Sequence, residues 1–230
     1  MAISFDAVAD RNSAAGATTI SWSHTTGASA DFIIGSGNCF DGTDADRALS
    51  SSTFNGDAMT LANTYNDDTL NMTSHLVYRI APDIGTFTFS LTFAGAVGSP
   101  CGGTTSLIGV KQTSPIGAVN GESNVDTQNI SIPLTTTAEN SWLYDDFIST
   151  QNTNGVEATS SQDTRWAFAL SGGRKHGGST KAATSIAEYT MDWDVGATTA
   201  DTIHNVVEIL AAVAPGGTTW PGYISPFGYR

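Results

Sequence analysis

Apolar and small polar residues alternate along much of the 230-residue chain. The stretch from Gly85 to Gly95 reads GTFTFSLTFAG, with phenylalanine or leucine at every second position and threonine or serine between them. Side chains of a β-strand point alternately to the two faces of a sheet, so this pattern predicts a strand with one buried face. The same alternation recurs along the chain and predicts a protein built of sheets.

Turn residues divide the chain into short candidate strands. Helical periodicity is weak, and helical turns are expected only at 44–50 and 57–65. Long alternating stretches between Gly, Asn and Asp clusters favour an all-β fold of packed antiparallel sheets. The expected strands are 3–8, 18–23, 31–36, 52–54, 59–62, 76–80, 87–93, 106–111, 129–134, 142–148, 165–170, 186–193 and 204–211.

The last expected strand is apolar on nearly both sides. Val206 and Glu208 alternate with Val207 and Ile209, which predicts a central strand or one covered by a partner. Large aromatic side chains dominate the buried area of β-sandwiches, so we expect the strand aromatics to pack in the core. The residues expected there include Ile20, Trp22, Trp142, Trp166, Tyr189, Met191 and Trp193.

The pattern changes after Ala214, where residues 215–230 read PGGTTWPGYISPFGYR. Three prolines in this segment exclude a regular strand or helix, which predicts an extended C-terminal arm beside a domain of residues 1–214. Aromatic residues outside a core favour contact with another surface. The arm is expected either to dock on a neighbouring subunit or to fold back on its own domain. Its candidate contact residues are Trp220, Tyr223, Phe227 and Tyr229.

The negative net charge argues against nucleic acids as partners. The net charge is −13, and nucleic-acid affinity rests largely on Lys and Arg, so DNA or RNA binding is not expected. Only 13% of residues are charged, about half the usual share of 25%, and such a surface suits packing against other surfaces or sugars.

The sequence predicts neither secretion by a leader nor membrane insertion. The first residues have no basic leader followed by an apolar core, and the apolar run at 206–214 is short and interrupted by Glu208. We expect synthesis in a host cytoplasm without a signal peptide.

The one basic cluster lies in GGRKHGGSTK and contains Arg174, Lys175, His176 and Lys181. The surrounding glycines predict a mobile solvated loop, with contact to a polyanion or carboxylate as the alternative.

Both cysteines, Cys39 and Cys101, lie in glycine-rich segments that are typical of turns. We expect free thiols, because folding in a cytoplasm disfavours disulfides. The alternative is a disulfide between two loops that meet at one end of the sandwich.

No catalytic motif is present. The sequence lacks GxSxG, HExxH, a phosphate-binding GxxxxGK and a dinucleotide fingerprint. The histidines His24, His75, His176 and His204 are scattered, which favours structural roles. No pair of carboxylates is distinguished by its spacing. We therefore do not expect an enzyme; a glycan-cleaving enzyme would need such a pair.

The most metal-like segment is DGTDAD, in which Asp41, Asp44 and Asp46 could give oxygen ligands to Ca²⁺. Solvated turn carboxylates, or a helix N-cap at Asp44, are the alternative. No other cofactor is expected.

A glycan site needs an exposed aromatic platform flanked by amide or carboxylate groups. Tyr65 with Asn66 and Asp67, and the arm residues Trp220 and Tyr223, are the candidates.

Several segments, in their order along the chain, resemble jelly-roll β-sandwich proteins of bacteriophage virions and phage-like genomic regions. The resemblance extends to about Ala212. Its segments are ISWSHTTG (20–27), FNGDAMTLAN (54–63), HLVYRIAPDIGTFTFSLTFAGA (75–96), IGVKQTSPIGA (108–118) and YTMDWDV (189–195).

This resemblance implies a single jelly-roll-like antiparallel β-sandwich without catalytic residues. It also implies a virion structural role, as a capsid decoration or a head or tail appendage. The expected partners are other copies of the chain and major capsid or tail proteins. The alternative function is a carbohydrate-binding, lectin-like receptor-binding module that recognises a surface glycan.

Overall fold

The computed structural model describes residues 2–12, 16–127, 129–150, 157–159, 161–169, 174–194 and 200–213. Strands dominate these residues, so the predicted all-β, sandwich-like class is confirmed. The one helix among them is α1 (Asp44–Arg47), and none of their helices is long and apolar enough to cross a membrane. The strands are β1 (Ser4–Asn12), β2 (Ala17–Thr26), β3 (Phe32–Phe40), β4 (Leu49–Phe54), β5 (Asp57–Ala58), β6 (Thr60–Asp67), β7 (Met72–Ile80), β8 (Gly85–Ile108), β9 (Ile116–Thr127), β10 (Asn129–Thr135), β11 (Ser141–Ser149), β12 (Glu157–Ala158), β13 (Asp163–Ala169), β14 (Lys175–Ala183), β15 (Glu188–Asp194) and β16 (Ala200–Ile209).

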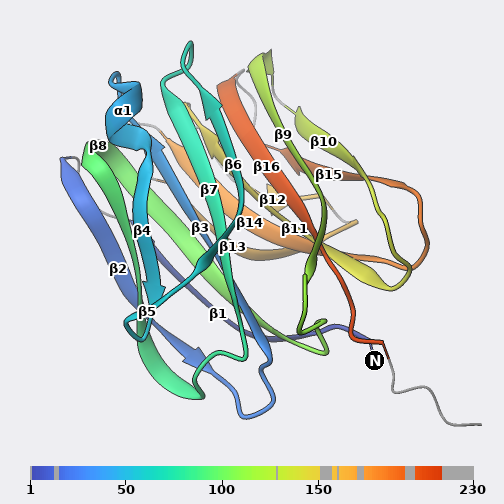
Figure 1. Cartoon of the computed structure of the whole chain (residues 1–230). Coiled ribbons are helices and arrows are strands. Elements are labelled where there is room, and N and C mark those ends of the chain that lie inside the picture. Colours follow the sequence, from blue (N-terminus) through green and yellow to red (C-terminus); the bar gives the residue numbers. More distant parts are fainter. Residues whose placement is uncertain are drawn as a thin grey trace, which may run out of the picture.

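Strand β8, 24 residues long, belongs to two layers at once (Figure 1). Its first half pairs with β2 and β4, and its second half pairs with β1 and β3. The eight-stranded sheet therefore folds over on itself. We call its two layers sheet I (β2, first half of β8, β4, β5) and sheet II (β1, second half of β8, β3, β7, β6).

The second half of the chain builds two further sheets. Sheet III has the order β13-β14-β11-β16-β9, and sheet IV has the order β10-β15-β12. All the pairings are antiparallel.

The four sheets stack in the order I, II, III, IV, because apolar clusters fill each space between them. Ile33 of β3 packs toward sheet I with Trp22, whereas its neighbours Phe32 and Ile34 pack toward sheet III with Tyr144. Sheets III and IV enclose further clusters, in which Leu143 and Val206 contact Met191 and Phe147 contacts Trp193. The protein thus consists of two sandwiches packed back to back.

This stacking explains strands that are apolar on both faces. Val206 faces sheet IV and Val207 faces sheet II, and both are fully buried. The prediction of a central strand at 206–210 is confirmed, and the covering layers come from the chain itself. The predicted burial of Ile20, Trp22, Trp166, Met191 and Trp193 is confirmed as well.

Two local predictions are wrong and one strand was missed, and in each case a polar or glycine-rich segment forms sheet. Residues 57–65, expected as a helical turn, form β5 and part of β6. The basic segment GGRKHGGSTK (172–181) was expected as a mobile loop, but from Lys175 onward it belongs to β14, where Lys175 and His176 are buried. Strand β9 was not expected at all.

Both cysteines lie in strands, not in the predicted turns. Cys39 belongs to β3 and Cys101 to β8, and both are buried free thiols, as expected. The glycines beside Cys101 allow close packing: a Cβ atom on Gly102 would lie 1.9 Å from the carbonyl oxygen of Ser36.

Candidate functional site

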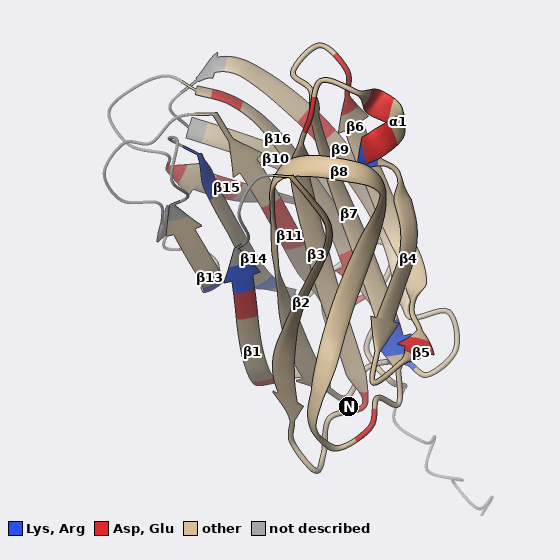
Figure 2. Cartoon of the chain, turned by 90° about the vertical axis from the view of Figure 1, so that its left-hand side faces the viewer, with Lys and Arg blue, Asp and Glu red and all other residues tan. Residues whose placement is uncertain are grey.

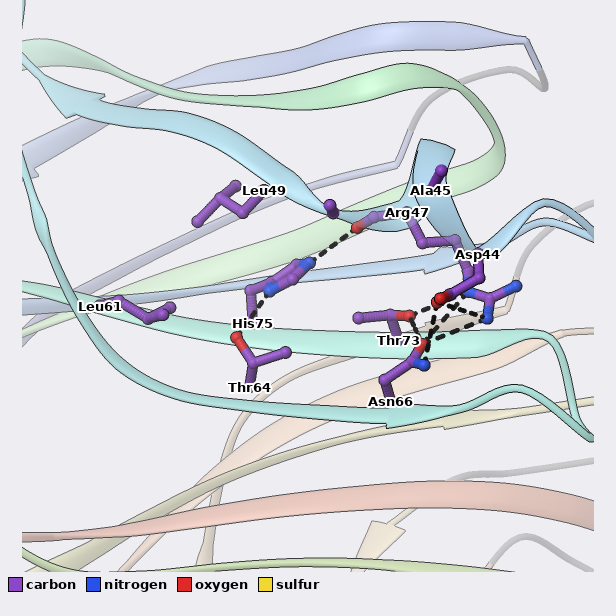
Figure 3. A pocket seen from close by; sticks show the side chains of 10 residues that line it. Asp44, Ala45, Arg47, Leu49, Leu61, Thr64, Asn66, Thr73 and His75 are labelled. Atoms are coloured by element: carbon purple, nitrogen blue, oxygen red, sulfur yellow. Dashed lines mark hydrogen bonds and ion pairs between the residues drawn. The ribbon is translucent and has the colours of Figure 1, made fainter.

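A pocket of about 340 Å³ opens beside α1, between the edges of sheets I and II (Figure 3). Leu49 and Leu61 lie on two sides of its mouth, and His75 and Thr73 lie on β7 behind it. A second pocket of about 370 Å³ continues along β4 and shares Leu49 and Leu61 with the first. Together the two pockets form a groove along β4, which we call the β4–β6 groove.

The guanidinium group of Arg47 closes the α1 end of the groove. Arg47 is 1% exposed. Its Nη2 donates to the carboxylates of Asp44 and Asp68, at 3.2 and 2.7 Å, and its Nε donates to Thr73 Oγ1 at 3.0 Å. Both Nε and Nη2 also reach the Asn66 side-chain oxygen. Five donors in a planar fork suit several oxygen acceptors at once.

The three carboxylates considered as candidate calcium ligands, Asp41, Asp44 and Asp46, point to different partners. Asp41 Oδ1 accepts from the Thr43 backbone N–H at 2.9 Å. Asp44 accepts from Arg47, whose cationic group occupies the centre of this oxygen cluster. The Asp46 side chain lies over Gly95 of β8. Among the described residues no group of three or more His, Cys, Asp or Glu side chains could hold a metal ion.

The helix begins one residue earlier than an N-cap at Asp44 would require. Thr43 is the N-cap residue of α1, without a side-chain cap hydrogen bond, and Asp44 is the first helical residue. Asp44 and Asp46 both lie in the first turn, where carboxylates favour the positive end of the helix dipole.

His75 stabilises the back of the pocket. Its Nε2 donates to the Arg47 carbonyl at 2.9 Å, which leaves Nδ1 to accept from the Thr64 hydroxyl at 2.9 Å. Burial lowers the pKa of His75, and the hydrogen bond to Arg47 opposes this only in part. The imidazole is therefore neutral, and both of its ring nitrogens are hydrogen-bonded.

A cysteine–histidine pair that the sequence did not reveal lies between sheets II and III. Cys101 Sγ and His176 Nδ1 are 2.6 Å apart, and both residues are fully buried. Burial raises the pKa of Cys101 well above its usual value and lowers that of His176 to about 3, with Arg174 lowering the latter further. The pair is thus a neutral thiol beside a neutral imidazole, whereas a reactive cysteine needs a thiolate.

A serine, a histidine and an aspartate meet between sheets III and IV, but not in the order of a hydrolase triad. Asp145 accepts from Ser179 Oγ at 2.5 Å, His204 Nε2 at 2.7 Å and Trp193 Nε1 at 2.8 Å. In a triad the histidine lies between the serine and the carboxylate. Here the carboxylate lies between them, and all four residues are buried.

Glu208, the one acidic residue in the apolar run of β16, is fully buried. Its carboxylate accepts from the backbone N–H groups of Ala118, Thr137 and Ala138 and from the Thr137 hydroxyl. Burial raises its pKa, but these hydrogen bonds outweigh burial and lower the pKa overall. In the sequence, the sign of this structural role is a single carboxylate within an otherwise apolar strand.

The candidate glycan platform at Tyr65 is turned inward. Its ring lies over Gly121 of β9, and its hydroxyl donates to Ser123 at 3.2 Å. The other aromatic candidates, Trp220, Tyr223, Phe227 and Tyr229, lie outside the described residues.

The outer face of sheet I carries an ordered array of hydroxyl groups. Thr19, Ser21, Ser23 and Thr25 on β2 pair directly with residues of the same kind on β8. Neighbouring hydroxyls also bond each other, as in Thr25–Thr86 at 2.7 Å. Figure 2 shows this face without Lys, Arg, Asp or Glu along β2, the first half of β8 and β4. The array, which we call the hydroxyl face, comprises Thr19, Ser21, Ser23, Thr25, Ser51, Thr53, Thr86, Thr88, Ser90 and Thr92.

The fold and these sites define an antiparallel all-β protein of stacked sandwiches with one uncharged hydroxyl face. No family model matches the chain, and neither a curated protein nor a solved structure matches it.

Proposed function

We propose that the chain is a non-enzymatic structural protein of a virion. In this proposal it is a capsid decoration or a head or tail appendage, and it associates with copies of itself and with a protein lattice. The observation that carries the proposal is the hydroxyl face of sheet I, which is free of charge in a protein with a net charge of −13.

Such a face suits burial against another protein. Charged groups are costly to remove from water and are depleted from the centres of protein interfaces. Serine and threonine hydroxyls can each donate and accept, so they adapt to the polar groups of a partner. The face spans three hydrogen-bonded strands and thus offers a broad contact.

The buried polar groups favour a structural role over a catalytic one. The Cys101–His176 and Asp145–His204 pairs are both enclosed between layers, where they join strands of different sheets or hold a strand pair together. The ordered resemblance of the sequence to virion proteins supports the same role.

The direct test counts this chain in particles. Quantitative mass spectrometry of density-banded particles from the source culture is expected to recover the chain in a fixed ratio to the major capsid protein. The ratio would separate a decoration from a fibre or collar. Recovery only from the soluble medium would contradict the proposal and favour a glycan-binding protein.

A charged substitution on the hydroxyl face tests whether this face is the contact surface in the particle. Ser21 lies opposite Ser90 in the middle of the array. Ser21→Lys is expected to lower the copy number per particle at least tenfold, because a lysine would have to be desolvated at the interface. Thr113→Lys, at an exposed position between β8 and β9, is the matched control and should leave the copy number unchanged. Normal incorporation of Ser21→Lys would exclude this face as the contact.

A further inference from the structure

The β4–β6 groove is the open side of the first sandwich. On the opposite side of the first sandwich, β1 packs against β2 and closes the edge between sheets I and II. On the groove side, β5 pairs with β4 only at Thr53 and Phe54, and β6 hydrogen-bonds to β7 as its one partner among the described strands. The groove therefore gives access to the edge of the core between sheets I and II.

Its lining is largely apolar and includes an exposed leucine. Leu61 is 52% exposed although it lies on a strand, and it lines both pockets together with Leu49. Ala58 and Met59 extend the same surface toward β5. Binding sites are typically clefts of about 300–1,000 Å³ with apolar walls and a few polar groups, and such walls suit an apolar side chain.

The chain contains a segment with complementary chemistry. Residues 215–230 hold four aromatic side chains and a single charged one, Arg230. The α1 end of the groove carries the carboxylates of Asp44 and Asp68, whose side chains are 63% and 68% exposed. An aromatic segment with one positive charge thus matches an apolar groove with a negative end.

The described chain ends far from the α1 end of the groove. Ala211 forms a bridge with Val110, whose N–H binds Asp31 just before β3 begins. Helix α1 follows the other end of β3, so about nine residues of extended strand, roughly 30 Å, separate the two places. Figure 1 shows them at opposite ends of the molecule. Trp220 follows Val213 by seven residues, an extended reach of about 23 Å, which is shorter than this separation. At the α1 end of the groove, Trp220 can therefore meet only the groove of a neighbouring copy.

We propose that the C-terminal arm, residues 215–230, of one copy docks in the β4–β6 groove of a second copy, with Trp220 as its apolar anchor. This inference rests on the self-association in the proposed function and names its contact. The interface is heterologous, because two different surfaces meet, and repetition joins copies head to tail.

Complementation between two variants of the full chain tests the docking. Leu61→Glu places a charge in the groove and leaves the arm intact, whereas Trp220→Ala removes the anchor and leaves the groove intact. Sedimentation velocity of the unmodified chain should show association that rises with concentration. Each variant alone should associate at least tenfold more weakly, since aromatic anchors dominate such contacts. An equimolar mixture of the two should form a one-to-one dimer and nothing larger.

The control is Ile84→Glu, an equally drastic change at a residue that is 59% exposed and outside the groove. It should associate like the unmodified chain. Circular dichroism of all the variants verifies that they are folded. A monomeric unmodified chain at every concentration, unchanged association of Leu61→Glu, or a mixture that stays monomeric would each overturn the docking. Recovery of the chain in particles tests the virion role separately, so the two can fail independently.

Discussion

At the scale of single residues, burial determines the protonation state of polar side chains in the interior. Asp146 lies between sheets II and III, accepts from Ser74 Oγ at 2.7 Å and has no hydrogen-bond partner at Oδ2. Burial raises its pKa to about 8, a larger effect than the opposing hydrogen bond to Ser74. Asp146 is therefore protonated at neutral pH, which removes the cost of a buried negative charge.

This raised pKa predicts how stability depends on pH. An unfolded aspartate has a pKa near 3.9, so between about pH 4 and pH 8 the folded state binds the extra proton and Asp146 lowers stability as the pH rises. The slope from one group is at most about 1.4 kcal/mol per pH unit. Asp146→Asn should remove this contribution, because an amide does not ionise. Urea unfolding at pH 5 and pH 8 should show a smaller loss of stability in the variant; an identical loss would disprove the assignment.

At the scale of the element, β14 shows how adjacent glycines admit large side chains on both faces. A Cβ atom on Gly177 would lie 2.7 Å from the rings of Phe147 and Trp193, and one on Gly178 would lie 2.4 Å from Trp166 Nε1. Neighbouring residues of a strand point to opposite faces, so each glycine accommodates a different tryptophan.

Gly178→Ala should destabilise the fold by about 1–3 kcal/mol, because Trp166 has to move within a packed core. Gly42→Ala is the control, since a Cβ atom there meets nothing within 4 Å, and its effect should stay within about 0.5 kcal/mol. Denaturant unfolding of both variants gives the comparison. Equal stabilities would show that the tryptophan is loosely held.

The glycines of β14 and β8 also show what the sequence could not predict. Alternation predicted strands such as β2, where Trp22 is buried and Ser21 and Ser23 are exposed, because one face meets water. In β14 both faces are covered, and the space is filled by side chains from other strands. Gly177 and Cys101 therefore carry no local signal of burial, and the Cys101–His176 pair depends on strands 75 residues apart in sequence.

At the scale of the whole molecule, the two sandwiches share a continuous interior. Phe32 and Leu107 of sheet II pack with Tyr144 and Val207 of sheet III. Hydrogen bonds cross the same space, such as Asn63 to Asn205 at 2.7 Å. Separation of the halves would expose both kinds of group to water.

The molecule should therefore unfold in a single transition. Trp22 lies between sheets I and II, and Trp193 lies between sheets III and IV. The fluorescence of Trp22→Phe therefore reports less on the first sandwich, and that of Trp193→Phe reports less on the second. In urea, the midpoint of each variant should coincide with its midpoint by far-ultraviolet circular dichroism, as two-state unfolding requires. Two separate midpoints would indicate that the sandwiches are independent.

The division of the sheets along the chain has a consequence for biosynthesis. Residues up to 108 complete sheets I and II, whereas sheets III and IV use only residues from 116 onward. While a ribosome is still adding the second half, the first sandwich presents Phe32, Ile34, Leu76 and Leu107 to solvent, since their cover has not been made. Chains synthesised side by side can stick together through such a surface. The rate at which residues 116–209 emerge therefore sets how long each nascent chain needs protection by chaperones.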